Sequence, residues 1–316
     1  MRGSRVFSFL IACSFLAVPL SAQQQSNGSR IWQDRGNTAV LDLTNGSGGT
    51  EHAPGTHFKF IKESKAGTSP KFVVADENGV TWKVKLGDEV RSETAATRLL
   101  WAAGYFVDEN YYRPQIQVQG LAHLDRGQEF VFGDTVKGVR LERDLKVDSK
   151  DWSWYDNVFT GTRELNGLKV MMALINMWDL KQVNNSTPGE QYTVADLGAT
   201  FGSTGNNFTR SKGVLKDYAA SKFIRKVTPE YVDFVMHSRP FFATAVTNPG
   251  NYRLRTRMET IVTGIPIADA RWIGNVLGQL STAQIKDAFH SAGFSSAEVD
   301  GYCMAVMLRI AELNKL

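Results

Sequence analysis

Cysteine is nearly absent from this chain of 316 residues, which contains only Cys13 and Cys303. So few cysteines exclude a scaffold held together by several disulfides, so the stability of the fold must come from a buried apolar core. Cys303 has Ala, Met and Leu among its neighbours in the sequence. This setting predicts a buried apolar residue rather than a nucleophile.

Blocks of like charge are also missing. The 36 Lys and Arg residues are scattered among 32 acidic residues, and the formal net charge is only +4. A basic stripe of the kind that binds nucleic acid is therefore excluded, and no nucleic-acid partner is expected. The five histidines show no spacing typical of zinc ligands.

Long hydrophobic runs are absent except near the N-terminus. A charged start, Met-Arg-Gly-Ser-Arg, precedes an apolar run over residues 6–20, and Ser21-Ala22 follows it. The run is shorter than the ~20 apolar residues that a membrane-spanning helix needs. This order predicts a signal peptide over residues 1–22 and export to the periplasm, the extracellular space or a secretory lumen, with no stable transmembrane segment. A lipoprotein-type cleavage before Cys13 is the weaker alternative, because the apolar run continues beyond it.

The remaining chain divides by composition. Residues 23–55 are rich in Gly, Ser, Asn, Thr and Gln, which predicts a flexible arm or linker. Residues 56–143 carry short alternating apolar segments typical of strands, and residues 144–316 carry the longer periodic segments typical of helices. The expected fold is α+β, with a small antiparallel β-rich N-lobe and a helical C-lobe.

Individual elements follow from the same patterns. Strands are expected over 58–61, 71–74, 80–86, 115–118, 129–132 and 139–142. Helices are expected over 93–103, 162–178, 268–280, 282–292 and 297–313. Ser281 is the expected N-cap of the fourth helix, and Ser295 or Ser296 that of the last. Asn78-Gly79 is expected to supply the positive φ angles of a hairpin turn.

Two polar segments stand out in the second half. Asp179-Leu180-Lys181-Gln182-Val183-Asn184 ends a predicted helix, and Asp196-Leu197-Gly198 begins 12 residues after Asn184. Magnesium prefers oxygen ligands and keeps phosphate and water in its shell, so a carboxylate with an amide oxygen suits it. A second carboxylate, free of metal, is suited to accept or orient the proton of an attacking hydroxyl.

In this order and spacing the two segments resemble the catalytic loop Asp-x-Lys-x-x-Asn and the metal-binding Asp-Phe-Gly of the protein-kinase-like superfamily. Upstream, Lys85 closes a predicted strand and Glu93 opens a predicted helix. This pair is similar to the phosphate-binding lysine and its helix glutamate. The short separation of the pair resembles HipA-type and phosphatidylinositol-kinase-like members most.

The resemblance implies roles for these residues. Lys85 would bind the nucleotide phosphates, and Glu93 would orient the Lys85 side chain. Asn184 and Asp196 would bind magnesium or manganese and, with it, ATP. Asp179 would position the acceptor hydroxyl, and Lys181 would neutralise the transferred phosphoryl group.

Several positions depart from the superfamily pattern or leave a choice open. Lys83 points to the same side of its strand as Lys85 and is the alternative phosphate ligand. No Gly-x-Gly-x-x-Gly precedes the lysine strand, and residues 66–71 are the nearest small, flexible segment. Met177-Trp178 replaces the usual His-Arg before the catalytic aspartate. Residues 202–213 stand where a substrate loop belongs.

The sequence therefore predicts a secreted ATP- and Mg-dependent phosphotransferase of kinase-like fold that acts on an unknown protein or small-molecule acceptor. Two alternatives stay open. One is a secreted kinase-like pseudoenzyme or ligand-binding module without turnover. The other is a kinase-like enzyme that transfers AMP.

Overall fold

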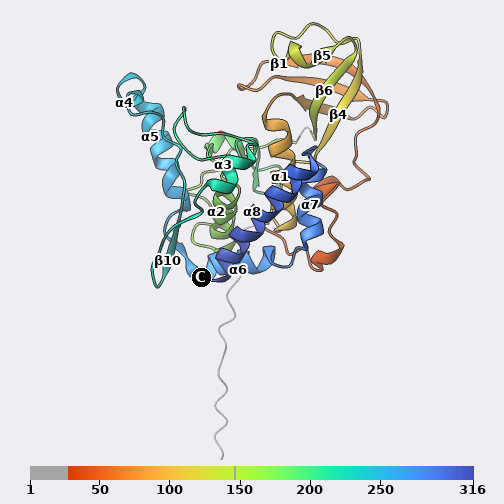
Figure 1. Cartoon of the computed structure of the whole chain (residues 1–316). Coiled ribbons are helices and arrows are strands. Elements are labelled where there is room, and N and C mark those ends of the chain that lie inside the picture. Colours follow the sequence, from red (N-terminus) through yellow and green to blue (C-terminus); the bar gives the residue numbers. More distant parts are fainter. Residues whose placement is uncertain (1–27, 146) are drawn as a thin grey trace, which may run out of the picture.

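The computed structural model describes residues 28–145 and 147–316, so the predicted signal peptide over residues 1–22 lies outside the described residues. Strands dominate the first half of this described part and helices the second (Figure 1), which confirms the α+β class. No helix in it combines the length and the apolar character that crossing a bilayer requires.

Within the described residues, six strands of the first half form one sheet in the order β3-β2-β1-β4-β6-β5, and β3 also pairs with β6. The sheet therefore closes on itself. Its strands are β1 (His57–Ser64), β2 (Lys71–Asp76), β3 (Thr81–Lys85), β4 (Asn110–Gln119), β5 (Val131–Phe132) and β6 (Thr135–Arg143). All pairs are antiparallel except β1 with β4, which are parallel. Alternate side chains such as Phe72, Trp82 and Leu141 point inward and form a separate apolar cluster.

Two local expectations about this sheet were wrong. The strand expected over 129–132 begins as a 3₁₀ turn, Gln128–Phe130, and only β5 remains. In the turn between β2 and β3, Gly79 has a φ of 79°, but Asn78 has no positive φ. The reason is that the Asp76 carboxylate accepts hydrogen bonds from the backbone N–H groups of Asn78 and Val80, and this shapes the turn instead.

Helix α1 (Glu89–Ala102) begins one turn earlier than the sequence predicted. Gly87, with a φ of 93°, turns the chain out of β3 and lets the helix start at once. Its buried residues Ala95, Leu99 and Leu100 join the large apolar cluster of the helical half rather than that of the sheet. Because α1 packs on both halves, it places its own first turns at their junction.

The predicted helices of the second half are present. They are α2 (Arg163–Leu174), α6 (Ile267–Leu277), α7 (Thr282–His290) and α8 (Ser296–Asn314). Ser281 and Ser295 each form a capping box with the residue three positions later. Helix α2 ends four residues before the predicted end, because Asn176 adopts a left-handed φ of 55° and stops it.

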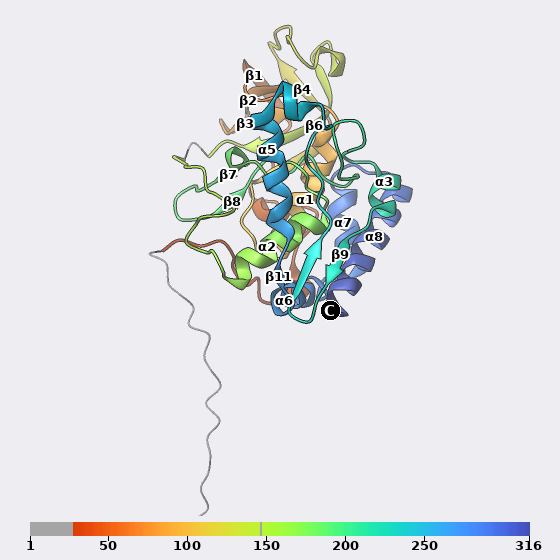
Figure 2. The ribbon, with the colours of Figure 1, turned by 90° about the vertical axis from the view of Figure 1, so that its left-hand side faces the viewer.

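Further elements were not predicted. A second sheet, in the order β11-β10-β9, contains β9 (Ile224–Val227), β10 (Tyr231–Phe234) and β11 (Ile265–Pro266). The short helices α3 (Leu215–Ala220) and α4 (Thr244–Thr247) and the longer α5 (Pro249–Met258) complete the set. Figure 2 shows α5 running along one flank of the helical half, with β9 and β10 beside it.

The predicted flexible arm over 23–55 is packed in its described part. Ile31 and Leu43 are each only 1% exposed and belong to the large apolar cluster. The indole N–H of Trp32 donates to the Ala103 carbonyl at 2.7 Å, and the Gln284 side chain donates to the Thr38 carbonyl at 2.7 Å. The polar composition did not indicate this packing, because a few isolated apolar residues are enough to anchor the segment to the core. Cys303 is buried, as expected.

Candidate active site

Lys85 is the last residue of β3, and its side chain is only 2% exposed. Its Nζ lies 2.8 Å from Oε2 of Glu93 and 2.6 Å from Oδ1 of Asp196. It also lies 2.6 Å from Oε2 of Glu89, which the sequence analysis did not single out. The structure thus brings together three of the residues predicted to form the nucleotide site, from a strand, a helix and a loop.

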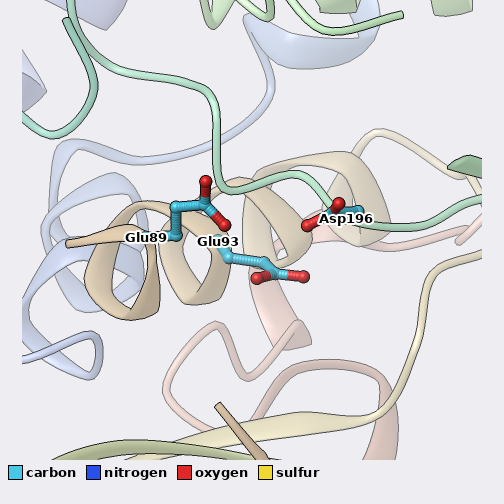
Figure 3. Close-up of side chains that lie close together, drawn as sticks. All are labelled: Glu89, Glu93 and Asp196. Atoms are coloured by element: carbon cyan, nitrogen blue, oxygen red, sulfur yellow. The ribbon is translucent and has the colours of Figure 1, made fainter. Parts of the chain in front are cut away.

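The start of α1 explains this geometry. Glu89 and Glu93 are four residues apart, so both project from the same face of the helix, and Figure 3 shows their carboxylates on the side of Asp196. Burial by itself lowers the pKa of Lys85, but the negative charge of Glu93, with Asp196 and Glu89, outweighs burial and raises the pKa above its ordinary value. Lys85 is therefore a buried ammonium ion held by carboxylates.

Glu89 belongs to this cluster, but sequence reasoning missed it. Besides Lys85, its carboxylate accepts a hydrogen bond from the Ser69 hydroxyl at 2.8 Å and pairs with Lys212 Nζ at 2.9 Å. Burial raises the pKa of Glu89, but the charge of Lys85 opposes burial and the net effect lowers the pKa to about 2. Glu89 could have been found from its position, four residues after Lys85 and four before Glu93. It was not, because the helix was predicted to begin only at Glu93.

Arg140 is a second residue that was missed. It lies on β6 directly opposite Lys85 in the β3–β6 pairing. Its Nε is 3.4 Å from Oε2 of Glu93, and its Nη1 donates to Glu142 at 2.8 Å. Arg140 and Lys85 therefore both contact Oε2 of Glu93, which is positioned by two cations. Nothing in the local sequence marked Arg140, because its role depends on strand register.

The alternative lysine lies elsewhere. The Lys83 side chain is 49% exposed and pairs with Glu142 at 3.1 Å and Asp144 at 3.6 Å. Among the described residues, Glu93 and Asp196 pair with Lys85 and not with Lys83, so the cluster is built around Lys85.

Asp179 and Asn184 lie together after α2. The Asn184 side-chain N–H donates to the Asp179 carbonyl at 2.9 Å, and the backbone N–H of Ala195 donates to the Asn184 carbonyl at 2.8 Å. The second contact connects the loop with the short hairpin of β7 (Asn185–Ser186) and β8 (Thr193–Val194), which leads directly to Asp196. The predicted catalytic loop and the predicted metal motif are therefore neighbours.

Two cations flank the Asp179 carboxylate. Lys181 Nζ is 2.9 Å from Oδ2, and Arg255 Nη2 is 3.1 Å from Oδ1. Arg255 comes from α5, which the sequence analysis did not predict. These contacts place both cations beside the Asp179 carboxylate.

Asp196 has a φ of 52°, in the left-handed region that few residues other than glycine adopt. Such a backbone conformation costs ~1 kcal/mol or more, is adopted more readily by aspartate and asparagine than by most residues, and recurs at active sites. The side chain is 46% exposed, in contrast to the buried Lys85 and Glu93. At Gly198 an added Cβ would lie 2.5 Å from Cβ of Glu89, so only glycine allows this loop to approach α1.

Asp196 and Asn184 are the two residues that the sequence predicted as metal ligands. The Asn184 amide nitrogen is already used by the Asp179 carbonyl, which leaves its oxygen as the free ligand atom. Carboxylate oxygens of Glu89, Glu93 and Asp196 also lie within 4.8 Å of one another. Lys85 Nζ contacts all three of these acids, so the cation held among them in this structure is an ammonium group.

The two predicted loops border the same cluster. Ser69, in the small, flexible segment predicted over 66–71, contacts Glu89, and Arg126 donates to the Gly67 carbonyl at 2.8 Å. In the loop over 202–213, Lys212 also reaches Glu89, and the Ser211 carbonyl accepts from the Trp178 indole at 3.0 Å. Both loops therefore converge on the first turn of α1.

The sequence matches no protein-family model and no curated protein. Among solved structures, it is similar to the Helicobacter pylori proinflammatory kinase CtkA, with a TM-score of 0.46 and 10% identity over 83% of this chain and 98% of that one. It is also similar to the Golgi casein kinase, with a TM-score of 0.39 and 10% identity over 83% and 73% of the two chains. A Golgi casein kinase structure with Mn/ADP bound gives 0.37 and 12% over 83% and 72%.

Proposed function

We propose that this protein is an ATP- and Mg- or Mn-dependent phosphotransferase of kinase-like, two-lobed architecture. The observation that supports the proposal most is the buried ammonium of Lys85, which contacts Glu93 at 2.8 Å and Asp196 at 2.6 Å. Burying a charged lysine is costly and must be offset by specific partners. A lysine held between a helix glutamate and an exposed loop aspartate is the arrangement that phosphoryl transfer uses.

The residues divide into three roles in this proposal. Lys85 binds the nucleotide phosphates, and Glu93, supported by Arg140, holds it in place. Asp196 and Asn184 supply the oxygen ligands of the metal, and Asp196 is exposed enough to exchange its contact with Lys85 for the ion. Bound magnesium supplies positive charge that compensates the phosphate oxygens.

Asp179 is the proposed base or positioning group for the acceptor hydroxyl. Its carboxylate lies on the loop joined through Asn184 to the metal motif, so the acceptor and the nucleotide would meet between the two segments. Lys181, 2.9 Å from Asp179, is placed to compensate the negative charge of the transferred group.

Nucleotide binding tests the proposal directly. ATP with magnesium or manganese should raise the melting temperature of the chain from residue 23 onward, because a ligand that binds only the folded state stabilises it by RT ln(1 + [L]/Kd). ATP without metal should have a much smaller effect. Absence of any shift at millimolar nucleotide with either metal would overturn the proposal.

The same protein preparation separates the alternatives. A ligand-binding module without turnover would show the thermal shift but no transfer of label from ATP. Mass analysis of a modified acceptor would distinguish phosphate from AMP, because AMP is the much heavier group.

We also propose that the protein is exported. The support is the order of charged, apolar and small residues over 1–22. N-terminal sequencing of the exported protein should begin at or near Gln23, and a lipid-modified Cys13 would contradict this.

A further inference from the structure

The proposed acceptor side of the site carries an excess of positive charge. Lys181 and Arg255 both pair with Asp179, at 2.9 and 3.1 Å. A third cation, Arg210, lies with its guanidinium carbon 4.2 Å from the centre of the Trp178 ring and interacts electrostatically with both Asp179 and Arg255. A single carboxylate does not balance these three cations.

Arg210 in particular lacks a partner for part of its guanidinium. Its Nη1 is buried and has no hydrogen-bond partner among the described residues. Burial lowers the pKa of Arg210, and the neighbouring charge of Arg255 lowers it further. A buried donor without an acceptor is costly, and a carboxylate or phosphate oxygen would relieve that cost.

Arg255 is almost fully buried and is held firmly. Its Nη1 donates to the Ser238 hydroxyl at 3.3 Å, and that hydroxyl donates to the Trp178 carbonyl at 2.7 Å. Arg255 and Arg210 both lie over the Trp178 ring, at 5.9 and 4.2 Å. The Trp178 ring therefore provides a platform for two arginines that come from other segments.

Phe208, on the loop that carries Arg210, lies beside residues of a second segment, 241–246, and together they form an exposed, mainly aromatic surface. We call this surface the loop patch; it consists of Phe208, Phe241, Phe242 and Val246, which are 75%, 39%, 70% and 86% exposed. The Phe208 and Phe241 rings are 5.7 Å apart, and the Phe241 and Phe242 rings 4.3 Å apart. The Phe241 backbone N–H donates to the Asn207 side chain at 2.9 Å, which attaches the patch to the loop.

Clustered exposed aromatic residues mark surfaces that bind other molecules. Phe208 is two residues before Arg210, so the loop patch begins next to the arginine pair. Figure 1 shows α4, which contains Val246, and α5 at the edge of the helical half. A small anion would fill the arginine pair alone, whereas a polypeptide would also cover the patch.

We propose that Arg210, with Arg255 adding to the positive charge, binds an acidic side chain of a polypeptide acceptor whose apolar neighbours pack on the loop patch. This inference rests on the proposed function, since it assigns the substrate class of the same site. Arginine suits the role because its guanidinium can bind a carboxylate through two parallel hydrogen bonds.

Fluorescence anisotropy with the full chain tests this without requiring catalysis. The probes are two labelled peptides of identical length, in which a central serine is flanked by Glu and Leu or by Gln and Leu. The Glu peptide should bind about tenfold more tightly, and the difference should shrink as salt rises. Arg210→Gln should remove most of the preference. Arg253→Gln, which removes the same charge from the exposed side of α5, should preserve it.

A second variant tests the patch. Phe242→Ser should weaken both peptides several-fold and leave the preference for Glu intact, because the ring contacts apolar side chains only. Equal affinity of the wild type for both peptides, or an unchanged preference in Arg210→Gln, would overturn the proposal. If free phosphoserine competes as strongly as the unlabelled Glu peptide, the site binds a small anion. This result would also overturn the proposal.

Failure of this inference is distinguishable from failure of the proposed function. If ATP with magnesium stabilises the wild type while the two peptides bind equally, only the acidic acceptor is wrong. If the Glu peptide binds through Arg210 while no nucleotide and metal stabilise the protein, acidic recognition stands and the phosphotransferase proposal fails.

Discussion

Nζ of Lys85 and Oδ1 of Asp196 lie 2.6 Å apart, although 111 positions separate the two residues in the sequence. Lys85 ends a strand of the first sheet, and Asp196 follows the short β7–β8 hairpin of the second half. This ion pair therefore joins the two halves of the molecule at the proposed nucleotide site. Because both residues are proposed to engage the nucleotide and its metal, binding must exchange this contact for new ones.

Removing the lysine should affect both stability and binding. Lys85→Met leaves the buried Glu93 with Arg140, at 3.4 Å, as its one ion-pair partner among the residues that the structure describes. We expect a loss of about 3 kcal/mol in the free energy of unfolding and no thermal shift with ATP and magnesium. Lys83→Met, at a side chain 49% exposed, is the matched control and should change stability by less than about 1 kcal/mol. Similar losses in both variants would contradict the assignment to Lys85.

Substitutions of Asp196 and Asp179 should affect different properties, nucleotide binding for Asp196 and turnover for Asp179. Asp196→Asn removes a charge from the proposed metal shell, so metal-dependent nucleotide binding should weaken. Asp179→Asn should leave nucleotide binding nearly intact and lower turnover by about 10²-fold or more. Thermal shift and steady-state kinetics measure the two properties, and circular dichroism checks the fold. Equal effects on nucleotide binding would mean that neither acid has its proposed role.

Glu89 should make the stability dependent on acidic pH. Its pKa is about 2 in the folded protein against an ordinary value of 4.5, so the unfolded chain takes up its proton first as pH falls. Its contribution is complete above about pH 5 and is lost towards pH 2, and amounts to on the order of 3 kcal/mol. Urea unfolding of wild type and Glu89→Gln should differ most near pH 6 and converge only towards pH 2. A difference that does not change with pH would refute this.

The last helix offers a test of the local structure. Ser295 accepts a hydrogen bond from the Glu298 backbone N–H, and the Glu298 carboxylate accepts one from the Ser295 N–H at 2.8 Å. Ser295→Ala should therefore cost about 1 kcal/mol of stability. Ser296→Ala, one residue later and also exposed, should have little effect. Chemical denaturation measures both, and a larger loss at Ser296 would place the cap there.

The sequence alone determined most elements of regular structure and the residues at the centre of the candidate site. Alternating and helical periodicities are local properties, so β2, β3, α7 and α8 were predicted with errors of a few residues at their ends. The residues Lys85, Glu93 and Asp196 were found because each has a recognisable neighbourhood in the chain. Local capping signals likewise identified Ser281.

The tertiary structure alone decided which other side chains complete the site. Arg140 reaches Glu93 only because β6 pairs with β3 in one register, and Arg255 reaches Asp179 only because α5 folds against the catalytic loop. Arg210 meets Trp178 through a loop that the sequence showed only as polar. Contacts of this kind depend on strand register and helix packing between distant segments. No local pattern encodes them, because the energy that selects them comes from burial of the whole core.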